Sequence, residues 1–376
     1  MSKALVNSLF AKSSQTRKLG ESIVKSETFN SAKGNRNIVI SGLTGSSVSL
    51  VVADVFKSTN LPFLVVFNNK EEAAYHLNDL ENLLGDQNVL FYPGSYRRPY
   101  QIEETDNANV LLRSEVLNRL NSRKKPALII SYPEALFEKV ITRKELEKNT
   151  LKISVSDSLS IDFVNEVLFE YQFKRTDFVT EPGEFSVRGG ILDVFSFSND
   201  EPYRIEFFGD DVDSIRTFDV ETQLSLELLK KISIIPNVDA SATLVTRLSF
   251  LDYISSKTVV FIKNSEILNA GIDTLFKKAT AIYLQEEGEI KMTEPSGLFC
   301  SSDILQKQLD TFTTVTFGAK SEVPSLEFKT QPQPSFNKQF NLLIENLNTN
   351  VDDGYKNYIF CSSEQQAKRF HDIFDD

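Results

Sequence analysis

Short apolar, β-branched runs alternate with longer amphipathic segments in the first third of the chain. The runs occupy residues 37–40, 63–67, 89–91 and 127–130, and the segments between them predict helices over 47–57, 71–84 and 106–121. This order is typical of parallel strands joined by crossover helices. The runs are almost entirely apolar, as expected when helices cover both faces of a sheet. The sequence therefore predicts an α/β fold built on a doubly wound parallel sheet.

The pattern of predicted helices and strands changes after residue 148. One predicted helix, 161–169, is followed by strands in quick succession, at 174–179, 184–188, 191–195, 203–207 and 212–219. Turn-forming residues separate the strands, so hairpins are the expected connections. This pattern predicts a small α+β domain over residues 149–221.

The alternation of predicted strands and helices resumes near residue 231. It predicts strands at 232–235, 258–262 and 313–317, and helices at 242–255 and 302–311. The small domain is therefore expected to be inserted into a larger one, made of residues 1–148 and 222–322.

A polar, proline-bearing stretch over 329–335 predicts a linker. A helix at 337–346, a strand at 358–361 and a helix at 363–374 follow it. We assign 323–376 to this linker and to the start of another α/β unit. A single strand followed by a helix cannot bury a core of its own. We therefore expect the chain to be a piece of a longer protein.

Charge and cysteine content exclude several classes of protein. The net charge of −11 argues against a chain whose main task is to wrap nucleic acid. Cys300 and Cys361 form no CxxC pair and have only His76 and His371 as possible companions, which supports neither a metal site nor a disulfide framework. No apolar run is long enough to span a bilayer. We expect a cytoplasmic protein.

A degenerate phosphate-binding loop follows the first predicted strand. A working loop, G-x-x-x-x-G-K-[ST], needs glycines, a lysine for the β- and γ-phosphates and a hydroxyl for Mg²⁺. The aligned residues are Gly42, Thr44, Gly45, Val48 and Ser49, with valine in place of the lysine. The helix that follows can hold an anion only weakly, so we expect no nucleotide hydrolysis here. The chain has no G-x-G-x-x-G dinucleotide motif either.

Several motifs together resemble the N-terminal, UvrB-homologous region of the bacterial transcription-repair coupling factors, the Mfd family. They are GLTG at 42–45, EFSVRGGILDVF at 184–195, YRIEFFGDDVDSIRTFD at 203–219 and QPQPSFN at 331–337. The resemblance implies a RecA/helicase-like sheet domain (domain 1a), an inserted domain 2 that binds UvrA, and the start of domain 1b. It also implies a monomer without catalysis, cofactor or metal in this region. Binding of RNA polymerase and DNA, and ATP- and Mg-dependent translocation, are implied for other domains of the family.

The alternative is a UvrB-like ATPase and damaged-DNA-binding domain. UvrB has the loop lysine and a long tyrosine-rich hairpin after the third strand, and this chain has neither. The corresponding segment here holds Tyr92, Tyr96 and Tyr100 with Arg97 and Arg98. Aromatic rings interleaved with cations can stack on nucleic-acid bases. A packed surface loop is the other interpretation of this segment.

Alternation along the small domain predicts one apolar and one charged sheet face. Tyr203, Ile205 and Phe207 are expected to point toward the helix, as are Phe185 and Val187. Glu184, Ser186, Arg188, Arg204 and Glu206 are expected on the opposite face. The resemblance implies that Arg175, Arg188, Arg204 and Glu206 bind UvrA. Either Lys174 or Arg175 can be the first cationic residue of this UvrA-binding set, and the sequence leaves the choice open.

Overall fold

The computed structural model describes most of the chain: residues 13–28, 37–95, 100, 107–122, 125–197, 199, 201–236, 246–285, 293–318, 324–337, 339–359, 361 and 363–375. The chain packs as two compact units, Met1–Thr330 and Gln331–Asp376. The second unit contains α13 (Phe340–Asp352) and α14 (Glu364–Asp375). No described helix has the length and apolar character needed to cross a membrane.

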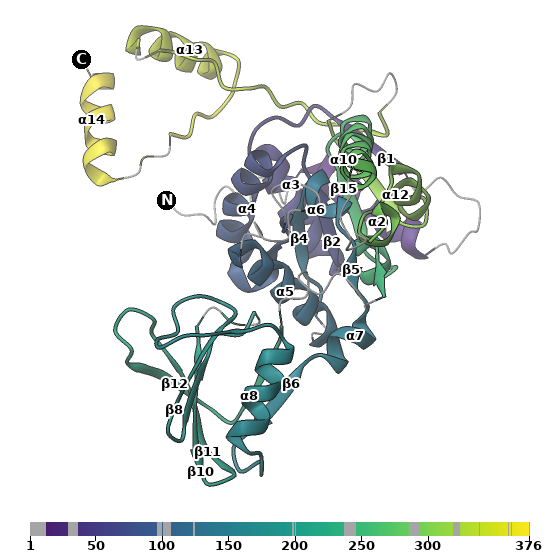
Figure 1. The fold of residues 1–376 in the computed structure, drawn as a ribbon. Coiled ribbons are helices and arrows are strands. Elements are labelled where there is room, and N and C mark those ends of the chain that lie inside the picture. Colours follow the sequence, from purple (N-terminus) through teal and green to yellow (C-terminus); the bar gives the residue numbers. More distant parts are fainter. Residues whose placement is uncertain are drawn as a thin grey trace. The chain divides into compact units, whose positions relative to one another are not determined.

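Seven described strands of the first unit form a wholly parallel sheet (Figure 1). In sheet order they are β17 (Leu326–Glu327), β1 (Asn37–Ser41), β16 (Thr313–Thr316), β15 (Val259–Ile262), β2 (Phe63–Val66), β4 (Leu128–Ser131) and β3 (Val89–Phe91). Every residue of β2, β4 and β15 is buried, which explains their apolar sequences. The predicted doubly wound α/β fold is confirmed.

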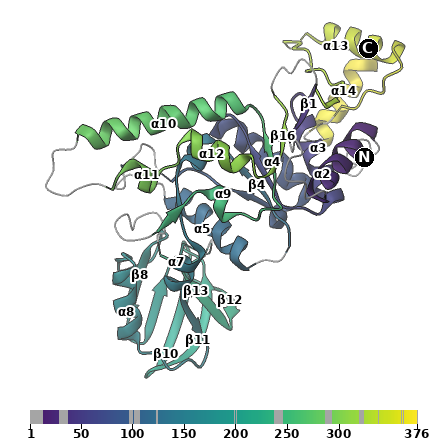
Figure 2. The ribbon, with the colours of Figure 1, turned by 90° about the vertical axis from the view of Figure 1, so that its right-hand side faces the viewer.

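Helices flank this sheet. The main ones are α2 (Ser14–Thr28), α3 (Ser47–Thr59), α4 (Lys70–Leu84), α5 (Asn107–Ser122), α10 (Ser265–Gln285) and α12 (Ser302–Leu309). Shorter elements complete the domain: α6 (Pro133–Phe137), α7 (Arg143–Lys148), α9 (Phe250–Tyr253), α11 (Pro295–Leu298), the 3-10 helix η1 (Asp86–Asn88), and the pair β5 (Val140–Ile141) and β14 (Arg247–Leu248). The 21-residue helix α10, prominent in Figure 2, is absent from the sequence prediction.

The small domain is a separate sheet with one helix, α8 (Ile161–Glu170). Its strands, in sheet order, are β12 (Ser225–Leu229), β11 (Asp211–Phe218), β10 (Tyr203–Phe208), β9 (Ile191–Val194), β8 (Glu184–Arg188) and β7 (Lys174–Arg175). All neighbours are antiparallel except β7 and β8. The predicted α+β character is confirmed, whereas β12 was not predicted.

Some predicted strands are wrong in placement or length. The strand predicted at 232–235 is β13 (Lys231–Ile234), which pairs antiparallel with β6 (Leu151–Ser154) and not with the parallel sheet. Its Ile232 and Ile234 side chains are buried in the core of the small domain. The prediction failed because alternation shows which side chains are buried but not against which sheet.

The strand predicted at 174–179 stops at Arg175, because Asp177 turns out of the ladder and its carbonyl accepts a hydrogen bond from Ser186 Oγ. Near the C-terminus, Tyr358, Ile359 and Cys361 lie in no strand, contrary to the prediction. Of the helix predicted at 242–255, only α9 is helical in the described part, and residues 247–248 form the strand β14 instead. The domain boundaries drawn from the sequence stay predictions.

Candidate partner-binding surface

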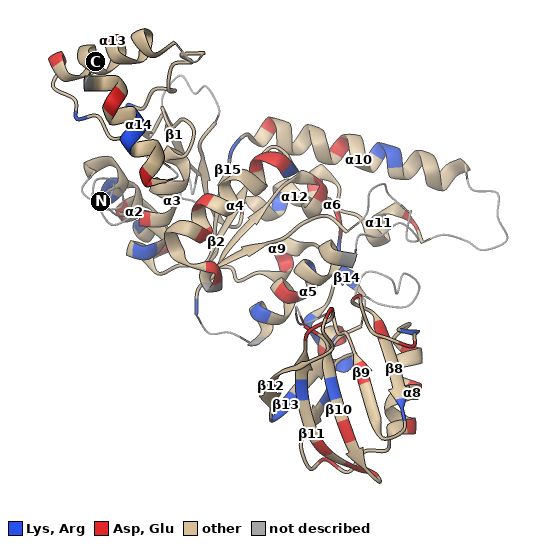
Figure 3. Ribbon diagram, turned by 90° about the vertical axis from the view of Figure 1, so that its left-hand side faces the viewer, with Lys and Arg blue, Asp and Glu red and all other residues tan. Residues whose placement is uncertain are grey.

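The small-domain sheet has one apolar and one charged face, as its alternation predicts. Phe185, Leu192 and Ile205 are fully buried and pack with Val164 and Leu168 of α8. The opposite face carries acidic and basic side chains. Figure 3 shows the acidic and basic residues of β8 to β11 as red and blue bands along these strands. The helix covers only one face, and the second face combines charged groups with a small buried apolar cluster of Val179, Phe195 and Phe218.

Asp193 lies at the centre of this charged face. Its side chain is 1% exposed. The Arg204 guanidinium binds it through two parallel hydrogen bonds, Nε–Oδ1 at 2.7 Å and Nη2–Oδ2 at 2.9 Å. Arg188 Nη2 donates to the same carboxylate at 2.5 Å. The hydrogen bond to Asp193 raises the pKa of Arg204, so the Arg204 guanidinium stays charged.

A second ion pair lies beside the first. Glu206 accepts hydrogen bonds from Arg216 and, at 2.6 Å, from Ser214 Oγ. The bond from Arg216 is the main cause that lowers the pKa of Glu206. Glu206 is therefore ionised at neutral pH and already has a partner within its own chain.

Aromatic rings support the two arginines. The Arg204 guanidinium lies 4.3 Å from the ring centre of Phe218, which is fully buried, and Arg188 lies 5.2 Å from the ring centre of Phe178. Arg204 is held on several sides and its side chain is only 14% exposed, against 41% for Arg188. Arg188 therefore has the greater freedom to reach a partner.

The strand register separates Lys174 from Arg175, which are both exposed. Lys174 lies opposite Glu184, and Arg175 lies opposite Phe185. Register partners project to the same side of a sheet, so Lys174 shares the charged face with Arg188. Arg175 lies on the side where Phe185 packs against α8 through an edge-to-face contact with Phe169, with ring centres 5.2 Å apart.

Sequence reasoning missed Asp193 and Arg216, which pair with the predicted residues. A signal was present: aspartate is unusual inside a strand, and Asp193 sits between two buried apolar residues, Leu192 and Val194. Such a residue needs a cationic neighbour across the ladder. Ser186, expected on the charged face, is 2% exposed and buried beneath it.

The phosphate loop is closed by the chain itself. Thr330 Oγ1 donates to the Gly42 carbonyl at 2.6 Å and accepts from the Thr44 amide at 3.0 Å. Ser47 Oγ lies 2.9 Å from the same amide. Gly42 has φ +77°, and a Cβ atom there would lie 1.6 Å from the Phe328 carbonyl oxygen. The Thr44 amide, one of the backbone groups that would receive a phosphate, is thus occupied.

The remaining loop residues do not fit a nucleotide either. Val48 is 7% exposed and packs in the core. Ser49, at the position of the magnesium-binding hydroxyl, is 1% exposed and shares a 2.7 Å hydrogen bond with His76 Nδ1. Burial lowers the pKa of His76 to about 4, so its imidazole is neutral. Gly45 has φ +52° and open space around it.

The tyrosine segment is packed where the structure describes it. Tyr92 is fully buried and stacks on Phe250 with ring centres 3.8 Å apart. Tyr100 is 9% exposed, and its hydroxyl donates to the Thr293 carbonyl at 2.8 Å. Neither ring is available to stack on a base. Tyr96, Arg97 and Arg98 lie outside the described residues.

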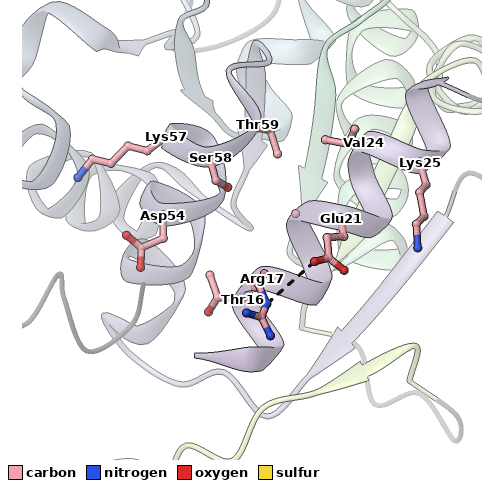
Figure 4. A pocket seen from close by; sticks show the side chains of 10 residues that line it. Thr16, Arg17, Glu21, Val24, Lys25, Asp54, Lys57, Ser58 and Thr59 are labelled. Carbon is pink, nitrogen blue, oxygen red and sulfur yellow. Dashed lines mark ion pairs between the residues drawn. The ribbon is translucent and has the colours of Figure 1, made fainter. Parts of the chain in front are cut away.

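A pocket of about 620 Å³ lies between α2 and α3 (Figure 4). Arg17, Lys25 and Lys57 line it together with Glu21 and Asp54, and Arg17 and Glu21 pair at 4.0 Å. Mixed charges select no ligand class, and none of the predicted site residues lines this pocket. The described residues contain no cluster of three or more potential metal-ligating side chains.

Known proteins match this chain in the region just described. Residues 151–239 match the family model of the UvrB interaction domain. The chain is 33% identical to the transcription-repair-coupling factor of Bacillus subtilis (strain 168) over 205 residues, 54% of this chain. It is 31% identical to that of Myxococcus xanthus over 222 residues, 57% of this chain. The predicted relationship to the transcription-repair-coupling factors is confirmed.

The matched stretch makes up 17% and 18% of those two coupling factors. The residues that match the UvrB interaction domain begin at the first residue of β6 and include β6 to β13 with α8. The charged face with Asp193 at its centre therefore lies within the matched residues.

Proposed function

We propose that the small domain of this chain docks UvrA through its charged sheet face. Lys174, Arg188, Arg204 and Glu206 share that face, and Arg175 lies at its β7 edge on the α8 side. The observation that carries the proposal is the Arg188–Asp193–Arg204 cluster, in which two guanidinium groups share one carboxylate. One positive charge is left for a carboxylate of the partner, and planar guanidinium groups suit such recognition.

The cellular role that follows is recruitment of nucleotide excision repair to stalled RNA polymerase. The match to the UvrB interaction domain and the similarity to transcription-repair-coupling factors support this role. We propose that binding of RNA polymerase and DNA, and ATP-driven translocation, belong to parts of a longer protein outside these 376 residues. In this proposal the region acts as a cytoplasmic monomer.

We also propose that these residues bind no cofactor and turn over no ATP. Thr330 occupies the loop, Val48 offers no charge and Ser49 is bonded to His76. Isothermal titration with Mg-ATP is expected to give no heat of binding at micromolar concentrations. Tight binding, or hydrolysis above a buffer blank, would instead favour the UvrB-like ATPase.

The experiment that tests docking is a titration of UvrA with the immobilised chain and two charge-reversal variants. Arg188→Glu should weaken binding about tenfold or more, because it removes a charge-assisted contact and adds repulsion. Arg17→Glu is the matched control, since Arg17 is an exposed arginine on α2 with a side chain 75% exposed. Full-strength binding by Arg188→Glu would remove this face from the proposal.

A further inference from the structure

Three leucines stand exposed along one edge of the small-domain sheet. Leu224, Leu226 and Leu228 are 67%, 53% and 76% exposed. Leu224 directly precedes β12, and Leu226 and Leu228 lie within it, where the β11–β12 register shifts between the pairs Arg216–Leu228 and Phe218–Ser225. Among the described strands β12 has a neighbour on one side only, β11. An apolar row on an open sheet edge is a hazard for a soluble domain unless a partner covers it.

The leucine row is joined to the charged face by direct contacts. Arg204 Nη1 donates to the Gln223 carbonyl at 3.2 Å, directly before Leu224. Leu228 lies opposite Arg216 in the β11–β12 ladder, and Arg216 pairs with Glu206. The contacts therefore run from Arg188 through Asp193 and Arg204 to Gln223, the residue before Leu224.

The charges of this face contribute little affinity by themselves. Arg204, Glu206 and Arg216 are already paired within the chain, and a partner carboxylate has to compete with Asp193 for the guanidinium groups. Protein interfaces obtain most of their free energy from a buried apolar centre, with charges at the rim. The charged face provides a rim, and the leucines provide the apolar element.

We infer that Leu224, Leu226 and Leu228 form the apolar part of the UvrA-docking surface. The matching surface on UvrA is then an apolar patch bordered by carboxylates that face the Arg188–Asp193–Arg204 cluster. This inference rests on the proposed function. It assigns the main source of the affinity for UvrA to the three leucines.

The dimensions agree with a single docking event. Four strand spacings separate β12 from β8 in the sheet order, which is roughly 19 Å at about 4.8 Å each. A standard interface of about 800 Å² per partner covers that span. One partner surface can therefore contact the leucines and Arg188 together.

The test compares UvrA binding of two matched leucine variants. The double variant Leu226→Ser/Leu228→Ser is expected to weaken binding about tenfold or more. Leu284→Ser is the control, because Leu284 on α10 is 75% exposed, almost the same as Leu228. Both variants should melt at the wild-type temperature, since exposed leucines contribute little to a core.

The outcomes separate the inference from the proposed function. Wild-type affinity of the double variant, with loss of binding by Arg188→Glu, overturns the leucine assignment and leaves docking in place. Failure of the wild-type chain to bind UvrA overturns both. Sedimentation of the chain alone, showing a dimer that the leucine substitutions dissociate, assigns the edge to a second copy and also overturns the inference.

A measurement on the unmodified chain also tests whether the leucines belong to the UvrA-docking surface. UvrA should slow hydrogen exchange of the amides in β12, because docking covers the leucine row and the open edge of this strand. Unchanged exchange in β12, with slowed exchange in β8 and β9, would restrict the docking surface to the charged residues.

Discussion

Asp193 holds Arg204 in a two-point contact across neighbouring strands, with Nε–Oδ1 at 2.7 Å and Nη2–Oδ2 at 2.9 Å. The two residues are register partners on β9 and β10. Their pairing makes the charged face a fixed arrangement before any partner arrives, because neither side chain has to be ordered on binding.

Asp193→Asn should destabilise the small domain by about 2–3 kcal/mol. The substitution leaves the Arg204 guanidinium, 14% exposed, without a full counter-charge, and breaking a pair in a buried setting costs about 3–5 kcal/mol. Partial exposure of Arg188 reduces the loss. Urea unfolding measures the difference, with the exposed Asp213→Asn on β11 as control. Equal stability of the two variants would contradict the structural role of Asp193.

Phe185→Ala should lower stability by about 3–5 kcal/mol, because a fully buried ring in the core beneath α8 is replaced by a cavity. Phe208→Ala provides the matched control. Phe208 is 84% exposed at the end of β10, so its removal should change the free energy of unfolding by less than about 0.5 kcal/mol. Similar melting temperatures for the two variants would show that the apolar face is assigned to the wrong side.

Gly42→Ala and Gly45→Ala form a second matched pair. Both glycines have positive φ, +77° and +52°, but only Gly42 has an atom within reach of an added methyl group. Gly45→Ala should cost about 1–2 kcal/mol through backbone strain alone. Gly42→Ala should cost about 3 kcal/mol or more, since the Phe328 carbonyl has to move. Thermal unfolding distinguishes the two, and equal costs would show that the Phe328 backbone does not contact Gly42.

His76 should make stability fall as the pH falls below neutrality. Its pKa in the folded chain is about 4, below the ordinary value of about 6.5. In this interval the unfolded chain takes up a proton that the folded chain does not, so unfolding becomes easier. Between pH 6.5 and 5 the loss should be about 1.5 kcal/mol, and it should level off below pH 4.

His76→Asn keeps a hydrogen-bonding group near Ser49 but does not titrate, so its stability should be flatter between pH 6.5 and 5. His371→Asn is the control, because His371 is exposed on α14. Urea unfolding at each pH provides the comparison. The same slope in wild type and His76→Asn would exclude His76 as the titrating group.

The middle of the parallel sheet was predictable because strands such as Phe63–Val66 and Val259–Ile262 are wholly apolar runs. The two-residue strand β17 at the edge of the sheet was not predicted. The charged face was predictable because polar and apolar residues alternate through Glu184–Arg188 and through residues 203–207. Two kinds of feature were not. The row of Leu224, Leu226 and Leu228 has apolar alternation with no core behind it, and no local signal marks such exposure. Thr330 meets Thr44 across 286 residues, and contacts at that separation leave no pattern in either segment.

The contact of Thr330 with the loop also means that a free anion has to compete with the Thr330 hydroxyl for the Thr44 amide. Thr330 follows β17, which is itself paired with β1, so its hydroxyl is an internal ligand on a very short tether. Short tethers give effective concentrations in the millimolar range or above. A free phosphate has to exceed that concentration without help from a lysine. The Thr44 amide is therefore occupied by a hydroxyl of its own chain before any free anion arrives.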